Sequence, residues 1–347
     1  MRIAQVAPLY ERVPPRLYGG TERVVAYLTD ELVRRGHDVT LFASGDSGTR
    51  ARLVAAVPEA LRLSPAGADP LPPHVVQLSQ VFERAGEFDV IHCHVDTLAL
   101  PFSRLVATPV VHTLHGRLDL PSLPPLFAHF RDVPLVSISD AQRRPLAHLG
   151  LAWAATVHHG LPLAQYPFSP QGGDYLAFLG RVSPEKGLDV AIALAREVGI
   201  PLRIAAKVDS LDRPYFEREI VPLLRGPLVE FLGEIGDGEK PAFLGGARAL
   251  LFPVDWPEPF GLVMIEALAC GTPVIARPRG SVPEVIEDGV TGFVADTLDD
   301  LVDAAKRIDT IDRAGCRRRF EERFSVARMA DGYEAVYRRL AAARRAA

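Results

Sequence analysis

The hydrophobic pattern of the first forty residues predicts a βαβ unit. Arg2 to Ala7 alternates loosely between polar and apolar residues and stops at Pro8, as a strand would. Apolar residues then recur at the one-face spacing of a helix, at Val24, Val25, Leu28, Leu32 and Val33. Gly36 ends that helix, and Val39 to Ala43 reads as a second buried strand. Such a unit implies a parallel sheet with a right-handed crossover.

Further apolar runs extend this sheet as far as residue 162. They predict strands at Asp89–His94, Pro109–Gly116, Leu135–Ile138 and Val157–Pro162. Ser139-Asp140 should cap a helix that begins near Ala141, because a short polar side chain accepts from free helical amides. Residues 46–80 are rich in proline and predict a surface excursion, with a helix near Val75–Arg84.

A composition break without periodicity, Pro167–Gly173, predicts a linker to a second αβ region. The strands expected after it are Tyr175–Leu179, Leu202–Ala206, Val229–Leu232, Ala249–Phe252, Pro273–Ala276 and Gly292–Ala295. The helices expected there are Leu188–Glu197, Glu239–Ala247, Gly261–Ala269 and a C-terminal one from about Val326. The pattern therefore predicts an α/β protein with two Rossmann-like domains.

Composition narrows the class of protein. The 347 residues suffice for about two domains of ordinary size, and 48% hydrophobic with 24% charged residues is typical of a soluble globular protein. A net charge of −4 offers no global basic field for nucleic acid. Three scattered cysteines favour a reducing compartment. The chain starts directly in a strand and has no apolar run of membrane-spanning length, so we expect no signal peptide, no membrane helix and a cytoplasmic location.

The first strand is not followed by the glycine pattern of a NAD-binding domain. G-x-G-x-x-G is missing from that turn, and Gly19-Gly20 stands just before the first helix instead. The pair is either a flexible loop or a place where the backbone approaches a ligand. We expect no cofactor.

The most informative stretch lies between the strands Ala249–Phe252 and Pro273–Ala276. Prolines on either side of Glu258 forbid helix there and hold an irregular turn. The amides from Phe260 to Val263 open a helix and, with its dipole, form a site for phosphate. Glu258 and Glu266 flank that site and suit a ligand that is part phosphate and part polyol. The plainer alternatives are that Glu258 caps the helix and that Glu266 is a solvated helical residue.

A second candidate for anion binding follows the strand Tyr175–Leu179. The loop Gly180–Gly187 carries Arg181, a planar fork of donors, and Lys186, a point charge. Its spacing is not that of a P-loop. By itself the loop is weak evidence for an anion-binding site, and together with the Glu258 turn it is strong evidence.

Three histidines and an arginine run complete the list of candidates. His92 and His94 should point to one face of their strand; no third ligand has a recognisable zinc spacing, so they read as cleft-lining or satisfied histidines. His115 should emerge at the carboxyl end of its strand, where open α/β sheets place ligands, although a lone histidine is often structural. Arg317-Arg318-Arg319, with Glu321 and Glu322 close by, reads as a solvated helical face.

The stretch from Glu258 to Glu266 resembles the E-x7-E motif of retaining glycosyltransferases of family 4. The surrounding Glu-Pro-Phe-Gly-Leu-Val, the Ala-Cys-Gly-Thr-Pro-Val and the later Gly280-Ser281-Val282-Pro283-Glu284 also look like that family. The resemblance extends from the first strand to about residue 325. It implies the GT-B fold, in which two Rossmann-like domains with parallel sheets face each other across a cleft. The domains would be residues 1–166 on the acceptor side and 174–325 on the donor side, with the helix 326–347 packing back on the first.

The resemblance also implies a role for each matching residue. The diphosphate of the donor would contact Arg181, Lys186, Gly20 and the amides of Gly261, Leu262 and Val263. The transferred sugar would contact Glu258, Phe260, Gly261 and His115, with Glu258 and His115 taken as the catalytic residues. Glu266 would bind the ribose, and Lys207, Glu234 and Ile235 would lie near the base. An asparagine often stands in the family where this chain has His159.

The expected function is therefore transfer of a hexose from a nucleotide diphosphate sugar to an unidentified acceptor, with retention. UDP-sugar is favoured on family frequency, and GDP- and ADP-sugars stay open. No metal is expected, because Arg181 and Lys186 neutralise the diphosphate in the family and no Asp-x-Asp motif stands in a plausible site. A front-face path is expected, in which the leaving phosphate takes the acceptor's proton. The acceptor could be a glycan, a lipid-linked sugar or a small molecule, and peripheral membrane contact is possible. The alternatives are an epimerase or phosphorylase on the same fold, or a non-catalytic nucleotide-sugar-binding module.

Overall fold

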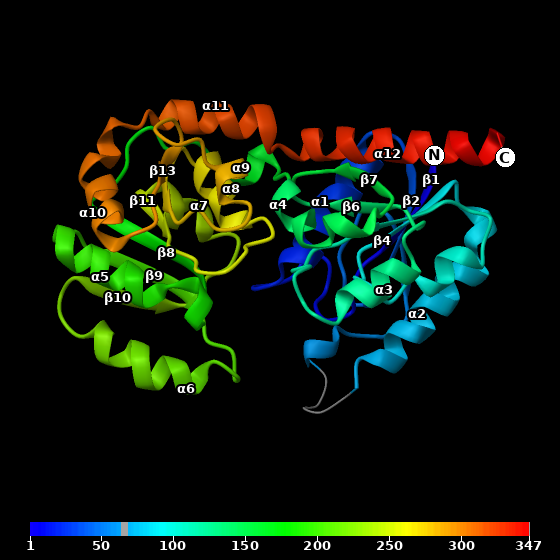
Figure 1. Ribbon diagram of the computed structural model, residues 1–347, viewed down its shortest axis with the longest axis horizontal. Coiled ribbons are helices and arrows are strands. Elements are labelled where there is room, and N and C mark those ends of the chain that lie inside the picture. Colours follow the sequence, from blue (N-terminus) through cyan, green and yellow to red (C-terminus); the bar gives the residue numbers. More distant parts are fainter. Residues whose placement is uncertain (64–68, 347) are drawn as a thin grey trace. The chain divides into compact units, whose positions relative to one another are not determined.

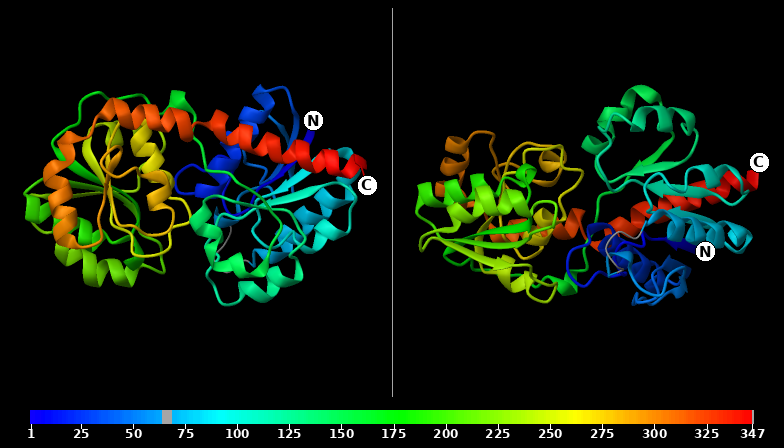
Figure 2. Two further views of the ribbon diagram at one scale, coloured as in Figure 1. Left: turned by 45° about the horizontal axis from the view of Figure 1, so that its top comes forward. Right: turned by 90° about the horizontal axis from the view of Figure 1, so that it is seen from below.

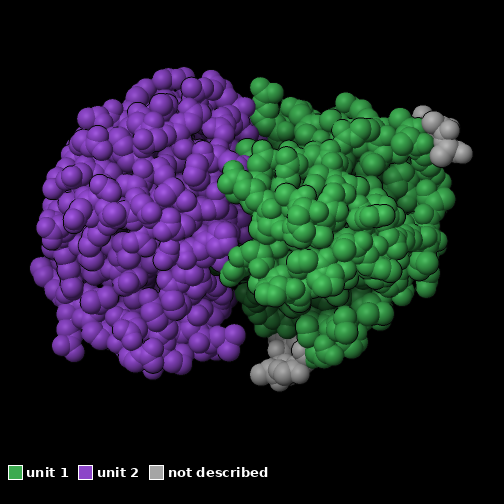
Figure 3. All heavy atoms as spheres, viewed as in Figure 1, with its two compact units in different colours: residues 1–160, 326–347 green, residues 161–325 purple. Residues whose placement is uncertain are grey.

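The computed structural model describes residues 1–63 and 69–346, and its chain forms two compact units. Unit 1 consists of Met1–Gly160 together with Val326–Ala347, and unit 2 is Leu161–Ser325; Figure 3 colours the two separately. The chain therefore leaves unit 1, builds unit 2 without interruption, and returns to unit 1 with its last helix.

Unit 1 is built on a parallel sheet of seven strands within the described residues. The strands are β1 (Arg2–Val6), β2 (Asp38–Ala43), β3 (Arg52–Ala55), β4 (Val90–Cys93), β5 (Val110–Thr113), β6 (Leu135–Ser137) and β7 (Trp153–Thr156). They lie in the order β3-β2-β1-β4-β5-β6-β7. The helices are α1 (Gly20–Arg34), α2 (Leu71–Glu83), α3 (Leu123–His129), α4 (Asp140–Arg143) and α12 (Val326–Ala346).

Alternation along the strands of unit 1 sorts their side chains onto two faces. Ala4 and Val6 of β1 join Leu78 and Val81 of α2 in one apolar cluster. The intervening Gln5 points to the other face, where its amide reaches Tyr337 of α12. Helix α12 therefore covers the sheet on the face opposite to α2 (Figures 1 and 2).

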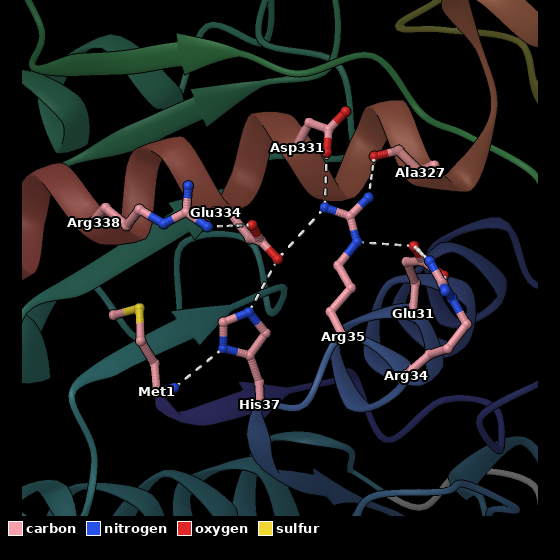
Figure 4. A network of polar contacts seen from close by, with 9 residues as sticks. All are labelled: Met1, Glu31, Arg34, Arg35, His37, Ala327, Asp331, Glu334 and Arg338. Atoms are coloured by element: carbon pink, nitrogen blue, oxygen red, sulfur yellow. Dashed lines mark hydrogen bonds and ion pairs between the residues drawn. The ribbon is translucent and has the colours of Figure 1, made fainter.

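Helix α12 is also held to the C-terminal end of α1 by a polar network, drawn in Figure 4. The guanidinium of Arg35 donates to the Asp331 carboxylate at 2.7 Å and to the carbonyl of Ala327 at 2.8 Å. Nε2 of His37 lies 3.0 Å from Oε1 of Glu334. The last helix thus belongs to unit 1 through both hydrogen bonds and ion pairs.

Every residue of unit 2, Leu161–Ser325, is described, and the unit repeats the same design with six parallel strands. They are β8 (Tyr175–Arg181), β9 (Leu202–Lys207), β10 (Val229–Gly233), β11 (Ala247–Phe252), β12 (Val274–Ala276) and β13 (Gly292–Val294). The helices are α5 (Leu188–Val198), α6 (Arg213–Tyr215), α7 (Lys240–Gly245), α8 (Leu262–Ala269), α9 (Val282–Val285), α10 (Leu298–Arg307) and α11 (Arg313–Arg323). Helices α5 and α10 pack together on the sheet, and α8 packs against α11 (Figure 1).

The strand order of each sheet determines where a ligand can be held. In unit 2 the order is β10-β9-β8-β11-β12-β13, so successive connections run in opposite directions from the junction of β8 and β11. Open α/β sheets bind ligands at such a switch point, outside the carboxyl ends of the strands. Arg181 is the last residue of β8, Lys186 lies in the loop after it, and the Glu258 turn follows β11. In unit 1 the corresponding junction lies between β1 and β4.

Several sequence predictions need correction. The strand expected at Val157–Pro162 is wrong: the last strand of unit 1 is β7, and the chain leaves the sheet after Thr156. The excursion at residues 46–80 contains β3, a short, half-buried edge strand that gives little hydrophobic signal. Residues 64–68 of that segment lie outside the described residues. Helix α2 starts earlier than expected because prolines fit its first turn. Helix α7 ends at Gly245, and Ala247 already belongs to β11.

Ser139, not Asp140, provides the cap of α4, since its side chain accepts from the amide of Gln142. All three cysteines are buried and free. Within residues 1–63 and 69–346, no helix combines the length and the apolar character needed to cross a bilayer.

Candidate functional site

The loop after β8 lies directly against the turn after β11. Gly187 has φ 68°, and a Cβ atom on it would collide with the carbonyl of Pro253. The amide of Asp255 donates to the carbonyl of Glu185 at 2.9 Å. Glycine at 187 therefore permits the close approach that brings the side chains of the two loops together.

The side chains of Lys186 and Glu258 form an ion pair where these loops meet. Nζ of Lys186 lies 2.6 Å from Oε2 of Glu258, and Nε1 of Trp256 donates to the same oxygen at 2.8 Å. The Lys186 ammonium also lies 4.5 Å from the centre of the Trp256 ring. Glu258 is only 8% exposed, so its charge is balanced inside the protein instead of by bulk water.

The backbone of Glu258 is held by the segment that follows β12. Ser281 donates its amide to the carbonyl of Glu258 at 2.9 Å, and its hydroxyl to the carbonyl of Phe260 at 2.8 Å. A Cβ atom at Gly280, which has φ 57°, would collide with the backbone of Glu258. The Gly280-Ser281 pair thus fixes the position of the turn that carries the carboxylate.

Helix α8 starts immediately after this turn. Its N-cap is Gly261, with φ 81° and no side-chain cap, so the carboxylate of Glu258 does not cap the helix. The amides of Leu262 and Val263 belong to the first turn, where a helix has no internal acceptor for them. Amides at such a position, together with the helix dipole, favour the binding of an anion.

Glu266 occupies a second, fully enclosed position on α8. It is 1% exposed, and its Oε1 accepts from the hydroxyl of Tyr166 at 3.0 Å and from Nζ of Lys240 at 3.1 Å. The plainer reading of Glu266 as a solvated helical residue is therefore wrong. Each glutamate of the pair has its own lysine, Lys186 for Glu258 and Lys240 for Glu266.

Carboxylates surround the remaining cations of the site. Arg181 donates to Glu185 at 2.8 Å and lies 3.9 Å from Asp209 and 3.8 Å from Asp212. Lys207, at the end of β9, pairs with Asp209 at 2.9 Å. An incoming diphosphate would therefore have to compete with these acids for Arg181.

The two other residues expected near the base follow β10. Glu234 is exposed and Ile235 is half-buried. Arg317 corrects the reading of the arginine run: it donates to the carbonyls of Tyr166 and Ala269 and so ties the residue before the predicted linker to α8. Arg318 and Arg319 are exposed.

His115 of unit 1 lies at the carboxyl end of β5, among other histidines. Its Nε2 is 2.9 Å from Nδ1 of His94, and its ring stacks on that of His159 with centroids 5.3 Å apart. Burial lowers the pKa of His115 to about 3, so the ring is neutral at physiological pH. His92 and His94 point to one face, as predicted, with ring centroids 3.9 Å apart.

Two backbone features mark the neighbouring edge of unit 1. Gly20 is the exposed first residue of α1, and a Cβ atom on the preceding Gly19 would press on Pro15 at 2.7 Å. Asp96 has φ 48°, a strained value for a residue other than glycine, and accepts from the backbone amide of His115. Among the described residues no group of three or more His, Cys, Asp or Glu side chains could hold a metal ion.

The structure thus brings Lys186, Glu258 and the start of α8 together and places Glu266 further along the same helix. Sequence reasoning missed Trp256, Lys240 and Tyr166, which serve these carboxylates. A tryptophan two residues before Glu258 was a usable signal. Tyr166 and Lys240 stand at no regular spacing from Glu266, and only the fold reveals their contact with it.

Both halves of the chain match families of glycosyltransferases. A family model described as "Glycosyl transferases group 1" matches residues 165–322, and one described as "Glycosyltransferase Family 4" matches residues 18–165. Glycogen synthase of Mycobacterium tuberculosis is 28% identical over 343 aligned positions, which cover 84% of this chain and 81% of that protein.

Two solved structures have the same fold. Sucrose-phosphate synthase of Thermosynechococcus elongatus superposes with a TM-score of 0.80 at 21% identity and covers 99% of both chains. HepE of Anabaena, solved in complex with UDP and glucose, superposes with a TM-score of 0.73 at 19% identity and covers 96% of this chain and 98% of its own.

Two Rossmann-like units with these strand orders, matched across the whole chain by such structures, define the GT-B fold. The two family models together extend from residue 18 to residue 322. The chain belongs to the glycosyltransferases of family 4 type.

Proposed function

We propose that this glycosyltransferase moves a hexose from a nucleotide diphosphate sugar to an acceptor with retention of anomeric configuration. The observation that carries the proposal is the Lys186–Glu258 pair beside the first turn of α8, at the switch point of unit 2. A cation, free amides and a carboxylate at one edge suit a ligand with a diphosphate at one end and sugar hydroxyls at the other.

In this proposal the diphosphate contacts Arg181, Lys186, the amides of Gly261 to Val263, and Gly20 of unit 1. A diphosphate replaces carboxylates as the partner of Arg181, and new charge-assisted hydrogen bonds offset the cost of separating them. At Lys186 it adds to Glu258, because an ammonium has three donors. The family's use of this arginine and lysine is the reason for proposing turnover without a metal.

Glu258 and His115 are proposed to contact the transferred sugar, together with Phe260 and Gly261. The ion pair with Lys186 supports a positioning role for Glu258, because a carboxylate already engaged by an ammonium is a poor nucleophile. We therefore propose a front-face path in which the leaving phosphate takes the acceptor's proton. The enzyme contributes orientation and stabilisation of charge.

Glu266 is proposed to bind the ribose, since a carboxylate can accept from two hydroxyls. Its contacts with Tyr166 and Lys240 hold the carboxylate in a fixed position on α8. Lys207, Glu234 and Ile235 are proposed to lie near the base. We take UDP as the first nucleotide to test, on its frequency in the family, with GDP and ADP as competitors. The names of the relatives differ in product, so the acceptor stays open.

The test is a thermal-shift titration of the purified protein with UDP, GDP and ADP, followed by measurement of nucleotide release from the matching glucose donors. A ligand that binds only the folded state raises the melting temperature by mass action. We expect one nucleotide to stabilise wild type, Lys186→Met to lose most of that shift, and the exposed Lys306→Met to keep it. No stabilisation by any of the three would refute the donor assignment. Stabilisation without any sugar release or transfer would indicate a binding module.

A further inference from the structure

A chain of buried polar side chains runs behind His115, on the face of the unit 1 sheet that α12 covers. Gln5 of β1 lies beside His92 of β4 in the strand register, and His94 follows at the next position on the same face. Gln5, His92 and His94 are all buried. Polar groups at such positions have to satisfy one another, so the direction of every hydrogen bond is constrained.

The Gln5 amide is the branch point of this chain. Its nitrogen donates to the hydroxyl of Tyr337 at 3.0 Å, and its oxygen lies 2.8 Å from Nε2 of His94. An amide oxygen can only accept, so Nε2 of His94 carries the proton and Nδ1 keeps a lone pair.

That assignment fixes the next ring. Nδ1 of His94 lies 2.9 Å from Nε2 of His115, so Nε2 of His115 must donate. In a neutral imidazole the other nitrogen is then a bare acceptor. Nδ1 of His115 is buried and has no hydrogen-bond partner among the described residues. Burial lowers the pKa values of both His94 and His115, which keeps the two rings neutral.

The second branch runs away from His115. The Tyr337 hydroxyl lies 2.7 Å from Nδ1 of His92, and Nε2 of His92 lies 2.7 Å from Oγ1 of Thr113. Thr113 donates in turn to the hydroxyl of Tyr333 at 3.1 Å. This branch offers a control position within the same buried network.

We propose that Gln5 and His94 are positioning residues that hold His115 in its Nε2–H tautomer and present Nδ1 as an acceptor to a hydroxyl of the transferred sugar. The sugar contact rests on the proposed function, whereas the tautomer rests on this geometry alone. If the hydrogen bonds among Gln5, His94 and His115 all ran in the opposite direction, Nδ1 of His115 would be a donor. The experiment has to distinguish these two arrangements.

The tautomers are measured on the full-length protein labelled with ¹⁵N-histidine, because long-range ¹H–¹⁵N spectra distinguish Nε2–H from Nδ1–H rings. The signals of His94 and His115 are assigned by their loss in His94→Gln and His115→Asn. We expect both rings to be Nε2–H in wild type. A His115 ring protonated at Nδ1 would overturn the inference, whatever the activity.

The functional arm compares three variants for UDP release from UDP-glucose and for UDP affinity. Gln5→Met removes the acceptor for His94; we expect a mixed His115 tautomer, unchanged UDP affinity and a fall in turnover of about tenfold, the size of one lost hydrogen bond. Gln5→Glu keeps an acceptor oxygen and should restore both the tautomer and most of the turnover. Thr113→Val, on the other branch, should change neither.

Turnover by Gln5→Met that stays normal despite an altered tautomer would overturn the positioning role. The wild-type spectra decide the tautomer even where UDP-glucose is not a substrate. A failure of the proposed donor is therefore distinguishable from a failure of this inference.

Discussion

The Lys186–Glu258 pair allows stability and ligand binding to be separated by a double-mutant cycle of Lys186→Met and Glu258→Gln. Removing one partner of a fully buried pair costs roughly 3–5 kcal/mol. Here the side chains are 16% and 10% exposed, and Trp256 still donates to position 258 in both variants. We therefore expect each single change to lower the free energy of unfolding by about 1–3 kcal/mol, with a coupling of about 1–2 kcal/mol between the two.

The effects on UDP affinity should differ between the two variants. Lys186→Met loses a charge-assisted contact with the diphosphate, worth about 1.5–3 kcal/mol, or about 10- to 150-fold in Kd. Glu258→Gln should leave the Kd within about threefold, because UDP carries no transferred sugar, while kcat falls through misplacement of the anomeric carbon.

Calorimetric titration with UDP, chemical denaturation and initial rates on the four proteins of the cycle give all three quantities. A Glu258→Gln protein that loses UDP affinity as strongly as Lys186→Met would show that the carboxylate acts only by orienting Lys186. A Glu258→Gln protein that is less stable but turns over normally would show that the pair is purely structural.

Three further outcomes follow from the same structure. Glu266→Gln should mainly raise KM for the donor and weaken UDP binding, since a ribose contact is made equally in ground and transition states; a fall in kcat alone, by steady-state kinetics, would contradict it. The rate of transfer should be unchanged in excess chelator. If the chelator abolishes activity and manganese or magnesium restores it, the enzyme is not metal-independent. Burial works to raise the pKa of Glu334, but the hydrogen bond with His37 and the charge of Arg35 outweigh it and the pKa is lowered from 4.5. Its contribution to stability is thus full above that value and lost as pH falls through the folded pKa, so melting temperatures of wild type and Glu334→Gln should converge in acid and differ at neutral pH.

The sequence predicted most of the architecture because parallel strands buried on both faces leave continuous apolar runs. It failed where that signal is weak or misleading. β3 is a half-buried edge strand, and Val157 and Leu161 are buried without belonging to a strand of the sheet. The positions of Lys186 and Glu258 could be anticipated because each follows a strand, and carboxyl ends of adjacent parallel strands meet at one edge.

The partners of the site residues could not be anticipated in the same way. Lys240 reaches Glu266 from another helix, and Tyr166 reaches it from the residue just before the predicted linker, so neither contact has a sequence spacing. Arg317 belonged to a run that read as solvated, yet it donates to two backbone carbonyls. Long side chains act at a distance from their own backbone, and local pattern gives no measure of where their ends lie.

The return of α12 to unit 1 has a consequence for how the protein is made. Domains usually fold in the order in which the ribosome releases them. Here unit 2 is one continuous segment, Leu161–Ser325, whereas unit 1 needs Tyr337 to satisfy His92 and Gln5, and Tyr333 to accept from Thr113, in its interior. During translation the second unit can therefore mature first, while the first waits, with polar groups of its sheet still open to water, for the last helix to emerge. A released chain that ends at Ser325 should show a protease-resistant unit 2 and a unit 1 that is still cleaved.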